Sequence, residues 1–313
     1  MVNSKKFFKD LNKMRISNSV SDSTFKASDY WADVNNIYND EFQNLDFDTN
    51  GFIKNLRTSK VNRRFSGYAV ENRKIFEMFM FFYYKNLKSR DKHNIISKIS
   101  DGEPDKNLDE THVIDNINFS VDLLFSLDNV ITIAEYFPEI LSEELVVADL
   151  GAGWGGNGYI LNKVNKKISY NIFDLPEGLA ISQNYLPNII NQKNIHLFNS
   201  DLTSVSREYF LEHKLGFFGS QQLEIVKNKS IDLFINVQSF QEMRLEQIKK
   251  YFELINHKTR GYFYTKNYIK WTNHIHKETI GIEDYPWKNN WIEKIKNNSE
   301  NFQNHFVALF KIE

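Results

Sequence analysis

The chain contains no cysteine among its 313 residues. Disulfide bonds, thiolate zinc sites and cysteine nucleophiles are therefore excluded. A long hydrophobic run is also missing: the most apolar segment, Met78–Tyr84, is bounded by Glu77 and Lys85, whereas a membrane span needs about 20 apolar residues. The N-terminal residues show no apolar signal core and no small-residue cleavage site. We therefore expect a cytoplasmic protein without a membrane partner.

An excess of either charge is lacking as well. The 39 Lys and Arg residues nearly cancel the 40 Asp and Glu residues, which leaves a formal net charge of -1. This balance provides no electrostatic reason to expect a nucleic acid as partner. Hydrophobic residues make up 41% of the chain and aromatic residues 15%, which is enough to build the core of a soluble globular protein.

The two parts of the chain differ in pattern. Residues 1–142 show helical periodicity, clearest in Glu71–Leu87 and Val121–Phe137, and no convincing alternating strand. Residues 100–110 are rich in turn-forming residues and predict a loop, and the polar residues 1–25 are expected to be partly disordered. We interpret residues 1–142 as a helical N-terminal domain.

Residues 143–313 alternate between short apolar runs and helical stretches. Such alternation predicts an α/β domain with a doubly wound, mostly parallel sheet. Strands are expected at Leu145–Leu150, Ile168–Phe173, Ile195–Phe198, Ile231–Val237 and Gly261–Thr265, helices at Pro176–Ile190 and Arg244–Asn256, and an added edge strand at Phe306–Ile312.

The most informative motif is Asp-Leu-Gly-Ala-Gly-Trp-Gly-Gly over residues 149–156, where a predicted strand gives way to a helix. Glycines there allow a sharp turn and the close approach of a ligand. Their spacing alone also fits a dinucleotide-binding loop. The acidic Asp149, two positions before the first glycine, opposes that alternative, and the motif resembles the first motif of class I methyltransferases. This resemblance implies a loop that wraps the methionine portion of S-adenosylmethionine.

Two further acidic residues follow predicted strands. Asp174 ends the second strand and is expected to accept hydrogen bonds from ribose hydroxyls, while Asp201 follows the third and is expected to meet the adenine edge. Each has a structural alternative, because Asp174 precedes a predicted helix and Asp201 fits a turn. The predicted cofactor-binding residues are Asp149, Gly151, Ala152, Gly153, Trp154, Gly155, Asp174, Leu175, Asp201, Leu202, Asn236 and Gln238.

Four segments taken together suggest a narrower likeness. DLGAGWGG, FDLPEGLAISQNYL, IDLFINVQSFQEM and GYFYTKN, which span roughly residues 140–270, resemble a family of sugar O-methyltransferases. The resemblance implies methyl transfer from S-adenosylmethionine to a sugar hydroxyl of a glycan, a sugar nucleotide or a glycosylated metabolite. It brings no assigned catalytic residue, and the helical N-terminal half would then cover the acceptor.

A sugar hydroxyl is a weak nucleophile, so a general base is expected. Glu242 follows the fourth strand and is the first candidate, although Ser239 and Glu242 also fit a helix capping box. His274, with His276 two residues later, is a second candidate, either as base, as metal ligand or as a surface residue. The sequence shows no compact cluster of carboxylates and histidines, so we expect no metal.

Other candidates would bind or orient the acceptor. Tyr264 and Asn267 are expected near the methyl group, Tyr264 as a third catalytic candidate, with strand packing and a turn as their alternatives. Trp154 is expected to pack beside the cofactor or simply to be buried. Arg63, Tyr68 and Arg73 would hold a phosphate or sugar, unless the arginines are solvated surface charges. Predicted substrate-binding residues are Ser239, Asn267, Arg63, Tyr68 and Arg73.

The sequence thus predicts an S-adenosylmethionine-dependent O-methyltransferase with a small, sugar-containing acceptor, and it leaves homo-oligomerisation open. Alternatives are a methyltransferase of a phenolic or polyketide, a non-catalytic protein that retains the fold, and a dinucleotide oxidoreductase. Methylation of nucleic-acid amino groups is disfavoured, because Asn236-Val-Gln-Ser lacks the Asn/Asp-Pro-Pro-Tyr/Phe motif common in such enzymes.

Overall fold

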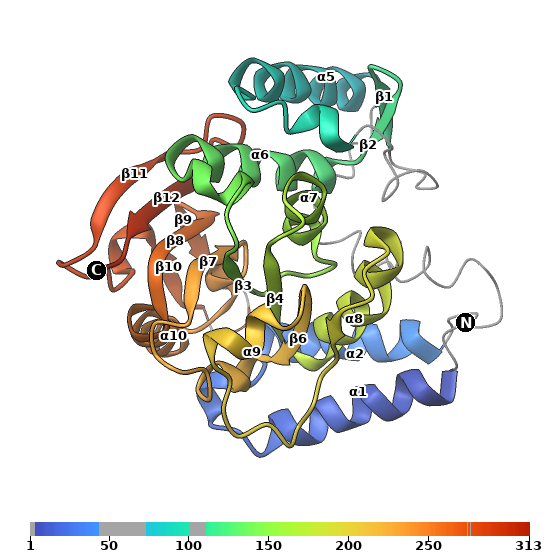
Figure 1. Cartoon of the computed structure of the whole chain (residues 1–313), viewed down its shortest axis with the longest axis vertical. Coiled ribbons are helices and arrows are strands. Elements are labelled where there is room, and N and C mark those ends of the chain that lie inside the picture. Colours follow the sequence, from blue (N-terminus) through green and yellow to red (C-terminus); the bar gives the residue numbers. More distant parts are fainter. Residues whose placement is uncertain (1–3, 44–72, 100–110, 274, 276) are drawn as a thin grey trace.

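The computed structural model describes residues 4–43, 73–99, 111–273, 275 and 277–313. One central sheet has helices on both faces (Figure 1). Its strand order is β11-β12-β8-β7-β3-β4-β6-β5. The strands are β3 (Val146–Leu150), β4 (Ser169–Asp174), β5 (Ile195–His196), β6 (Leu215–Gly219), β7 (Ile231–Val237), β8 (Thr259–Tyr268), β11 (Ile292–Asn298) and β12 (His305–Lys311). Strands β3 to β8 pair in parallel, and β12 runs antiparallel to β8 and β11. The predicted doubly wound, mostly parallel sheet is confirmed.

Each face of the sheet has its own hydrophobic core, because neighbouring strand residues point to opposite sides. Val147 of β3 belongs to the core beneath α6 (Val121–Tyr136), α7 (Gly156–Val164) and α8 (Pro176–Ile190). Val146 and Ala148 belong to the core beneath α9 (Arg207–Leu211) and α10 (Leu245–Lys258). Burial on both faces accounts for the continuous apolar runs by which the inner strands were predicted.

The predicted position of the last strand within the sheet is wrong. The apolar run Phe306–Ile312 was expected at an edge, but β12 lies between β8 and β11. The edge is β11, whose sequence IEKIKNN is mostly exposed. Charged, polar side chains suit an edge strand because they discourage pairing with other chains, and they also hide the strand from a search for apolar runs.

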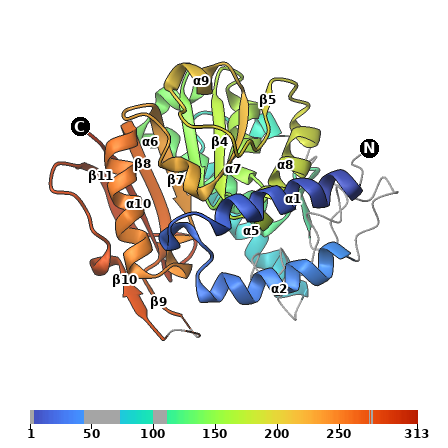
Figure 2. The same ribbon diagram turned by 90° about the horizontal axis from the view of Figure 1, so that it is seen from below.

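Two antiparallel helices of the N-terminal region lie beneath the sheet domain (Figure 2). These are α1 (Ser4–Ser19) and α2 (Asp29–Gln43), with the short helix η1 (Ser23–Phe25) between them. The expected partial disorder of residues 1–25 is therefore wrong for residues 4–25. Phe7, Leu11 and Met14 of α1 are buried at helical spacing, and α1 packs against α8.

Helix α5 (Arg73–Arg90) and strands β1 (His112–Ile114) and β2 (Ile117–Phe119) lie on the side of the molecule opposite α1 and α2 (Figure 1). Helix α5 packs on α6, and β1 and β2 form a hairpin that was not predicted. Remaining short elements are η2 (Ile96–Ile99), η4 (Pro138–Leu141), η5 (Ser220–Leu223), η6 (Phe240–Glu242), β9 (Lys270–Thr272), β10 (Thr279–Gly281) and η7 (Ile282–Asp284).

A domain boundary at residue 142 stays a prediction. Buried side chains of α1, α5 and α6 share one hydrophobic core with β3, β4 and α8, so side chains from both parts of the chain pack together. Among the described helices, none combines the length and the apolar composition required to cross a bilayer.

Candidate active site

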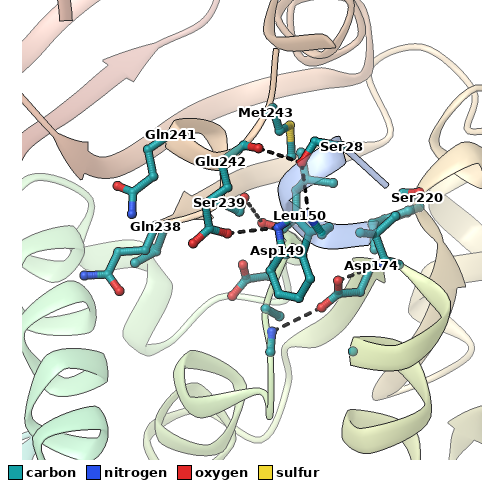
Figure 3. A pocket seen from close by; sticks show the side chains of 18 of the residues that line it. Ser28, Asp149, Leu150, Asp174, Ser220, Gln238, Ser239, Gln241, Glu242 and Met243 are labelled. Atoms are coloured by element: carbon teal, nitrogen blue, oxygen red, sulfur yellow. Dashed lines mark hydrogen bonds between the residues drawn. The ribbon is translucent and has the colours of Figure 1, made fainter. Parts of the chain in front are cut away.

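A cavity of about 350 Å³ lies at the carboxyl ends of β3, β4 and β7 (Figure 3). Strand order reverses at this point, since β3 has β4 on one side and β7 on the other. In open α/β sheets ligands bind at such a reversal. The cavity walls come from the loop after β3, the ends of β4 and β7, the start of α6 and the segment Phe25–Trp31.

The glycine loop after β3 forms the floor of the cavity. Gly151, Gly153 and Gly155 have φ values of 72°, 58° and 91°, which side chains other than glycine rarely adopt. A Cβ atom at Gly151 would lie 2.6 Å from the Cβ of Ser239, so this position also requires glycine for space. Gly151, Ala152, Gly153 and Trp154 line the cavity. Gly155 lies outside the lining and precedes the first residue of α7.

Asp149 is buried at the end of β3 and lines the cavity. Its Oδ2 atom accepts hydrogen bonds from the Tyr170 hydroxyl at 2.5 Å and from Nδ2 of Asn157 at 3.0 Å. Its Oδ1 atom has no hydrogen-bond partner among the described residues. Burial raises the pKa of Asp149 to about 6, against the opposing effect of the two hydrogen bonds. A buried carboxyl oxygen without a partner is costly and marks a place for a ligand donor.

Asp174 ends β4 and connects that strand to the glycine loop. Its Oδ1 accepts a hydrogen bond from the backbone N–H of Leu175 at 2.7 Å, and its Oδ2 accepts one from Gly153 at 3.2 Å. Withdrawal from water raises the pKa of Asp174 to about 7. The alternative role as helix cap is not seen, because Leu175 is the cap residue of α8 and no side chain caps this helix. Both Asp174 and Leu175 line the cavity.

Glu242 lies across the cavity, in η6 after β7 (Figure 3). Its Oε2 accepts a hydrogen bond from the indole N–H of Trp31 at 3.0 Å. The capping-box alternative is wrong: Ser239 makes no side-chain cap bond, and its hydroxyl donates instead to the Leu150 carbonyl at 3.2 Å. Burial raises the pKa of Glu242 to about 8, although the bond from Trp31 opposes this.

The wall formed by Phe25–Trp31 was not predicted. The Ser28 hydroxyl donates to the backbone carbonyl of Glu242 at 2.8 Å, and Nε2 of Gln247 donates to the carbonyls of Thr24 and Lys26, both at 3.0 Å. These bonds join residues more than 200 positions apart, so no local sequence pattern predicts them. The aromatic residues Tyr30, Trp31 and Tyr38, which line the cavity, are the signal in the sequence from which this wall could have been predicted.

Aromatic and amide side chains surround the cavity beside Glu242. The aromatic members are Tyr30, Trp31, Tyr38, Phe125, Tyr268 and Trp271. Gln238 and Gln241 supply the amides. Gln238 has a φ of 55°, and its backbone N–H donates to the Lys266 carbonyl at 2.8 Å. A left-handed residue other than glycine costs energy and is often found at functional sites.

Asp201 and Leu202 do not reach the cavity, which corrects their predicted roles. Asp201 is exposed and Leu202 is half-buried against the core beneath α10. The reason is the strand order: β6, which the sequence did not reveal, lies between β4 and β5. The residue that follows the neighbour of β4 is therefore Ser220, which lines the cavity.

Three other predicted residues are buried beneath the cavity rather than in its lining. Asn236 donates through Nδ2 to the Leu150 carbonyl at 3.2 Å, and Nδ2 of Asn267 donates to Oδ1 of Asn236 at 3.1 Å. The Tyr264 hydroxyl donates to Oδ1 of Asn129 at 3.0 Å. Burial raises the pKa of Tyr264 well above its ordinary value. A direct catalytic role for Tyr264 is therefore corrected, as are direct ligand contacts for both asparagines.

The remaining candidates lie elsewhere. Arg73 is exposed at the start of α5, where it pairs with Glu77 at 2.7 Å and donates to the Thr111 carbonyl at 2.8 Å. It does not line the cavity. Arg63, Tyr68, His274 and His276 lie outside the described residues. Within the described ranges, no group of three or more His, Asp or Glu side chains is arranged to hold a metal ion.

Comparisons with known proteins give similarities of fold only. No protein-family model and no curated protein matches the chain. A magnesium protoporphyrin IX methyltransferase from Synechocystis PCC 6803, solved with bound SAH, is 10% identical, with a TM-score of 0.43 over 74% of this chain and 100% of that one. The PH0226 protein from Pyrococcus horikoshii OT3 is 11% identical, with a TM-score of 0.42 over 58% and 86%. A SAM-dependent methyltransferase from Aquifex aeolicus is 14% identical, with a TM-score of 0.34 over 62% and 100%.

Proposed function

We propose that the protein is an S-adenosylmethionine-dependent O-methyltransferase that acts on a sugar hydroxyl. One observation carries the proposal: a glycine loop and three carboxyl groups, those of Asp149, Asp174 and Glu242, line a single cavity where the strand order reverses. The cofactor supplies an electrophilic methyl group when bound. The residues of the chain bind the cofactor, orient the acceptor and deprotonate its hydroxyl group.

The residues of the cavity fit this cofactor by charge. S-adenosylmethionine carries a sulfonium and an ammonium group, both cationic, and the cavity contains carboxyl groups whose pKa is raised by burial. A cationic ligand would relieve that burial cost. A dinucleotide would instead bring an anionic pyrophosphate towards Oδ1 of Asp149, which disfavours the oxidoreductase alternative. We assign Asp174 and Leu175 to the ribose, and Asp149 with Gly151, Ala152, Gly153 and Trp154 to the methionine portion.

Glu242 is the proposed general base. It lines the same cavity, and its carboxyl group is held by the Trp31 indole N–H at 3.0 Å. With a pKa of about 8, its anionic form is a stronger base than an ordinary carboxylate and can accept the hydroxyl proton as the oxygen attacks. Trp31 leaves the second carboxyl oxygen for this task.

The acceptor class is proposed from the wall beside Glu242. Rings such as Tyr268 and Trp271, stacked at a centroid distance of 5.0 Å, offer flat apolar surfaces for the C–H faces of a sugar. Gln238, Gln241 and Glu242 offer hydrogen bonds to several hydroxyls. The resemblance of the sequence to sugar O-methyltransferases supports the same class. A phenolic acceptor would use the rings but leave most of these polar groups without partners, which makes it the second candidate.

Calorimetric titration with S-adenosylhomocysteine tests the cofactor class. Saturable one-to-one binding is expected, and Asp174→Ala should weaken it at least about tenfold, because it loses charge-assisted hydrogen bonds to the ribose. Asp201→Ala is the matched control and should leave affinity unchanged, since Asp201 is exposed outside the cavity. Folded protein that gives no binding heat contradicts the proposal. Mass spectrometry over sugar and phenolic acceptors then separates the two acceptor classes.

A further inference from the structure

A line of hydrogen bonds runs from the middle of the sheet to Asp149. The Tyr264 hydroxyl on β8 donates to Oδ1 of Asn129 on α6 at 3.0 Å. Nδ2 of Asn129 donates to Oδ1 of Asn157 on α7 at 3.1 Å. Nδ2 of Asn157 then donates to Oδ2 of Asp149 at 3.0 Å. The Tyr170 hydroxyl of β4 donates to this same oxygen.

The direction of every bond in this line is fixed by chemistry. An ionised carboxylate only accepts hydrogen bonds, so Asn157 must turn its NH₂ group towards Asp149 and its carbonyl oxygen towards Asn129. Asn129 must in turn present its NH₂ group to Asn157 and its oxygen to Tyr264. All four residues are buried, with exposed fractions of 0% for Tyr264, 1% for Asn129, 7% for Asn157 and 1% for Asp149. Asn129 and Asn157 also line the cavity with Asp149, whereas Tyr264 does not.

The consequence concerns the two oxygens of Asp149. Asn157 and Tyr170 both donate to Oδ2, and Oδ1 has no partner among the described residues although it is buried beside the cavity. The arrangement holds one carboxyl oxygen inside the protein and keeps the other free for a ligand. Rotation of the carboxyl group would break two hydrogen bonds.

We propose that Tyr264, Asn129 and Asn157 are positioning residues that hold Oδ1 of Asp149 ready for the α-ammonium group of the cofactor's methionine portion. This inference rests on the proposed function and extends it. S-adenosylhomocysteine has a single cationic group, its α-ammonium, and Oδ1 is a buried anionic acceptor that lacks a donor. Tyr264, which sequence reasoning placed beside the methyl group, then acts through Asn129 instead.

Two ligands test the proposal in one protein. S-adenosylhomocysteine carries the amino-acid portion, whereas 5′-methylthioadenosine keeps the adenosine and lacks the ammonium group. Tyr264→Phe should weaken the binding of S-adenosylhomocysteine about 3- to 5-fold, the loss expected for one neutral hydrogen bond. Asn157→Ala should weaken it about 10-fold, because the lost hydrogen bond is charge-assisted. Affinity for 5′-methylthioadenosine should change less than about twofold in both variants.

Tyr264→Phe is the decisive variant, because Tyr264, unlike Asn129 and Asn157, does not line the cavity. Tyr262→Phe is its matched control: Tyr262 lies on the same face of β8 and stacks on Phe137 at a centroid distance of 4.3 Å, outside the cavity lining. It should leave both affinities unchanged. Binding of 5′-methylthioadenosine also reports that each variant is folded.

Equal losses for both ligands, or no loss of S-adenosylhomocysteine in Tyr264→Phe and Asn157→Ala, would overturn the positioning role. The proposed function would stand in either case, because the wild-type protein would still bind both ligands. Absence of S-adenosylhomocysteine binding to the wild-type protein is a different result, and it removes the proposed function together with this inference.

Discussion

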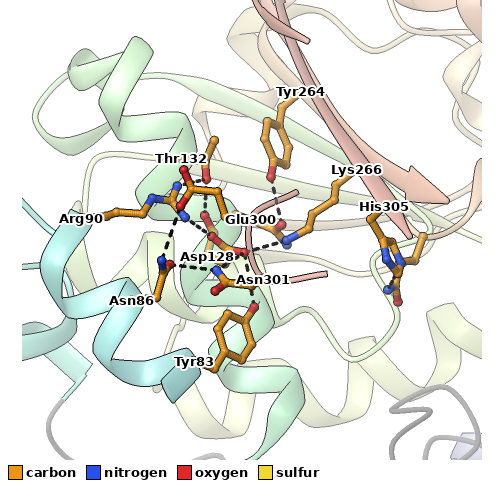
Figure 4. Close-up of polar contacts among 12 residues, drawn as sticks. Tyr83, Asn86, Arg90, Asp128, Thr132, Tyr264, Lys266, Glu300, Asn301 and His305 are labelled. Atoms are coloured by element: carbon orange, nitrogen blue, oxygen red, sulfur yellow. Dashed lines mark hydrogen bonds and ion pairs between the residues drawn. The ribbon is translucent and has the colours of Figure 1, made fainter. Parts of the chain in front are cut away.

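Two groups of buried or half-buried charged side chains differ in how their charges are balanced. One, the paired cluster, consists of Arg90, Asp128 and Lys266 (Figure 4) together with Glu135, which lies 3.3 Å from Arg90. The other, the pocket carboxyls, consists of Asp149, Asp174 and Glu242 (Figure 3). The first combines both charges, whereas the described residues provide no ion pair to the second. Comparing the two groups separates the effect of burial on the pKa of a carboxyl group from the effect of a neighbouring cation.

In the paired cluster, Asp128 is 3% exposed. It receives Nζ of Lys266 at 2.7 Å and Nη1 of Arg90 at 2.7 Å. Burial alone would raise the pKa of Asp128, yet the two cations together hold it below its ordinary value. The Lys266 ammonium group also lies 4.2 Å from the centre of the Phe125 ring, a cation–π contact.

Among the pocket carboxyls, burial acts without such compensation. The pKa values of Asp149, Asp174 and Glu242 rise to about 6, 7 and 8. In the paired cluster, cations of the protein itself thus offset the burial of the carboxyl group. Among the described residues, the pocket carboxyls have no such cation. This difference is the physical reason to expect a cationic ligand in the cavity.

The largest expected effect comes from removing the proposed base, Glu242. Glu242→Gln should lower kcat/KM by about 10²–10⁴-fold, because Gln cannot accept the hydroxyl proton. In the wild-type protein kcat/KM should rise with pH to a plateau, with an apparent pKa near 8, since only the deprotonated carboxyl group acts as base. Initial rates from pH 6 to 9.5 measure both. Wild-type activity that does not change with pH, or a fully active variant, would contradict the assignment.

The next effect concerns the paired cluster. Lys266→Met keeps a long side chain between Phe125 and Phe302 but leaves Asp128 with a single cation, Arg90. Losing one partner of a buried pair costs about 3 kcal/mol or more. Urea unfolding should show this loss of stability, and adding Asp128→Asn to Lys266→Met should recover part of it.

Lys250→Met is a matched control for this experiment. Lys250 pairs with Glu224 at 2.8 Å, but both side chains are exposed, at 39% and 44%. The variant should change the free energy of unfolding by less than about 0.5 kcal/mol. Equal losses for Lys250→Met and Lys266→Met would remove the contrast between buried and exposed pairs.

The last expected effect is a change of stability with pH. Below pH 4.5, the ordinary value for glutamate, Glu242 is protonated in both the folded and the unfolded chain. Between pH 4.5 and about 8 the unfolded chain releases the proton first, so the stability of the wild-type protein falls as pH rises. Glu242→Gln does not titrate and can still accept the Trp31 hydrogen bond, so its advantage in Tm should grow from pH 5 to pH 8.5.

Calorimetric scans at those two pH values measure the difference. Glu246→Gln, four residues further on and exposed, is the control and should show no such trend. A Tm difference for Glu242→Gln that is the same at both pH values would mean that the folded protein does not shift the pKa of Glu242.

Sequence reasoning succeeded where the evidence was local. Asp149 and the glycines that follow it occupy consecutive positions, and the strand before them is a continuous apolar run, so both the loop and its place at a strand end could be predicted. Asp174 and Glu242 could be placed at the cavity for the same reason, since Asp174 directly follows one predicted strand and Glu242 comes five residues after another.

Sequence reasoning failed where the position of a residue depends on which distant segments of the chain pack together. The order of strands in a sheet is a long-range property, so the insertion of β6 beside β4 moved Asp201 away from the cavity without any local sign. Tyr264 lies on the expected strand, but the direction of its side chain depends on α6 packing above it. The contact of Trp31 with Glu242 joins residues 211 positions apart. The apolar stripe of α1, by contrast, was visible in the sequence and was overlooked.

The hydrogen bond from Ser28 to Glu242 has a consequence during synthesis, since it spans 214 residues. Translation at about 5–20 residues per second makes the N-terminal helices roughly 10–40 s before the ribosome produces their partner. Until α8 and the sheet have been made, Phe7, Leu11 and Met14 have no core to pack against. Helix α1 is therefore an amphipathic segment that a chaperone can bind during synthesis, and the cavity wall at Ser28 can close only after Glu242 has been made.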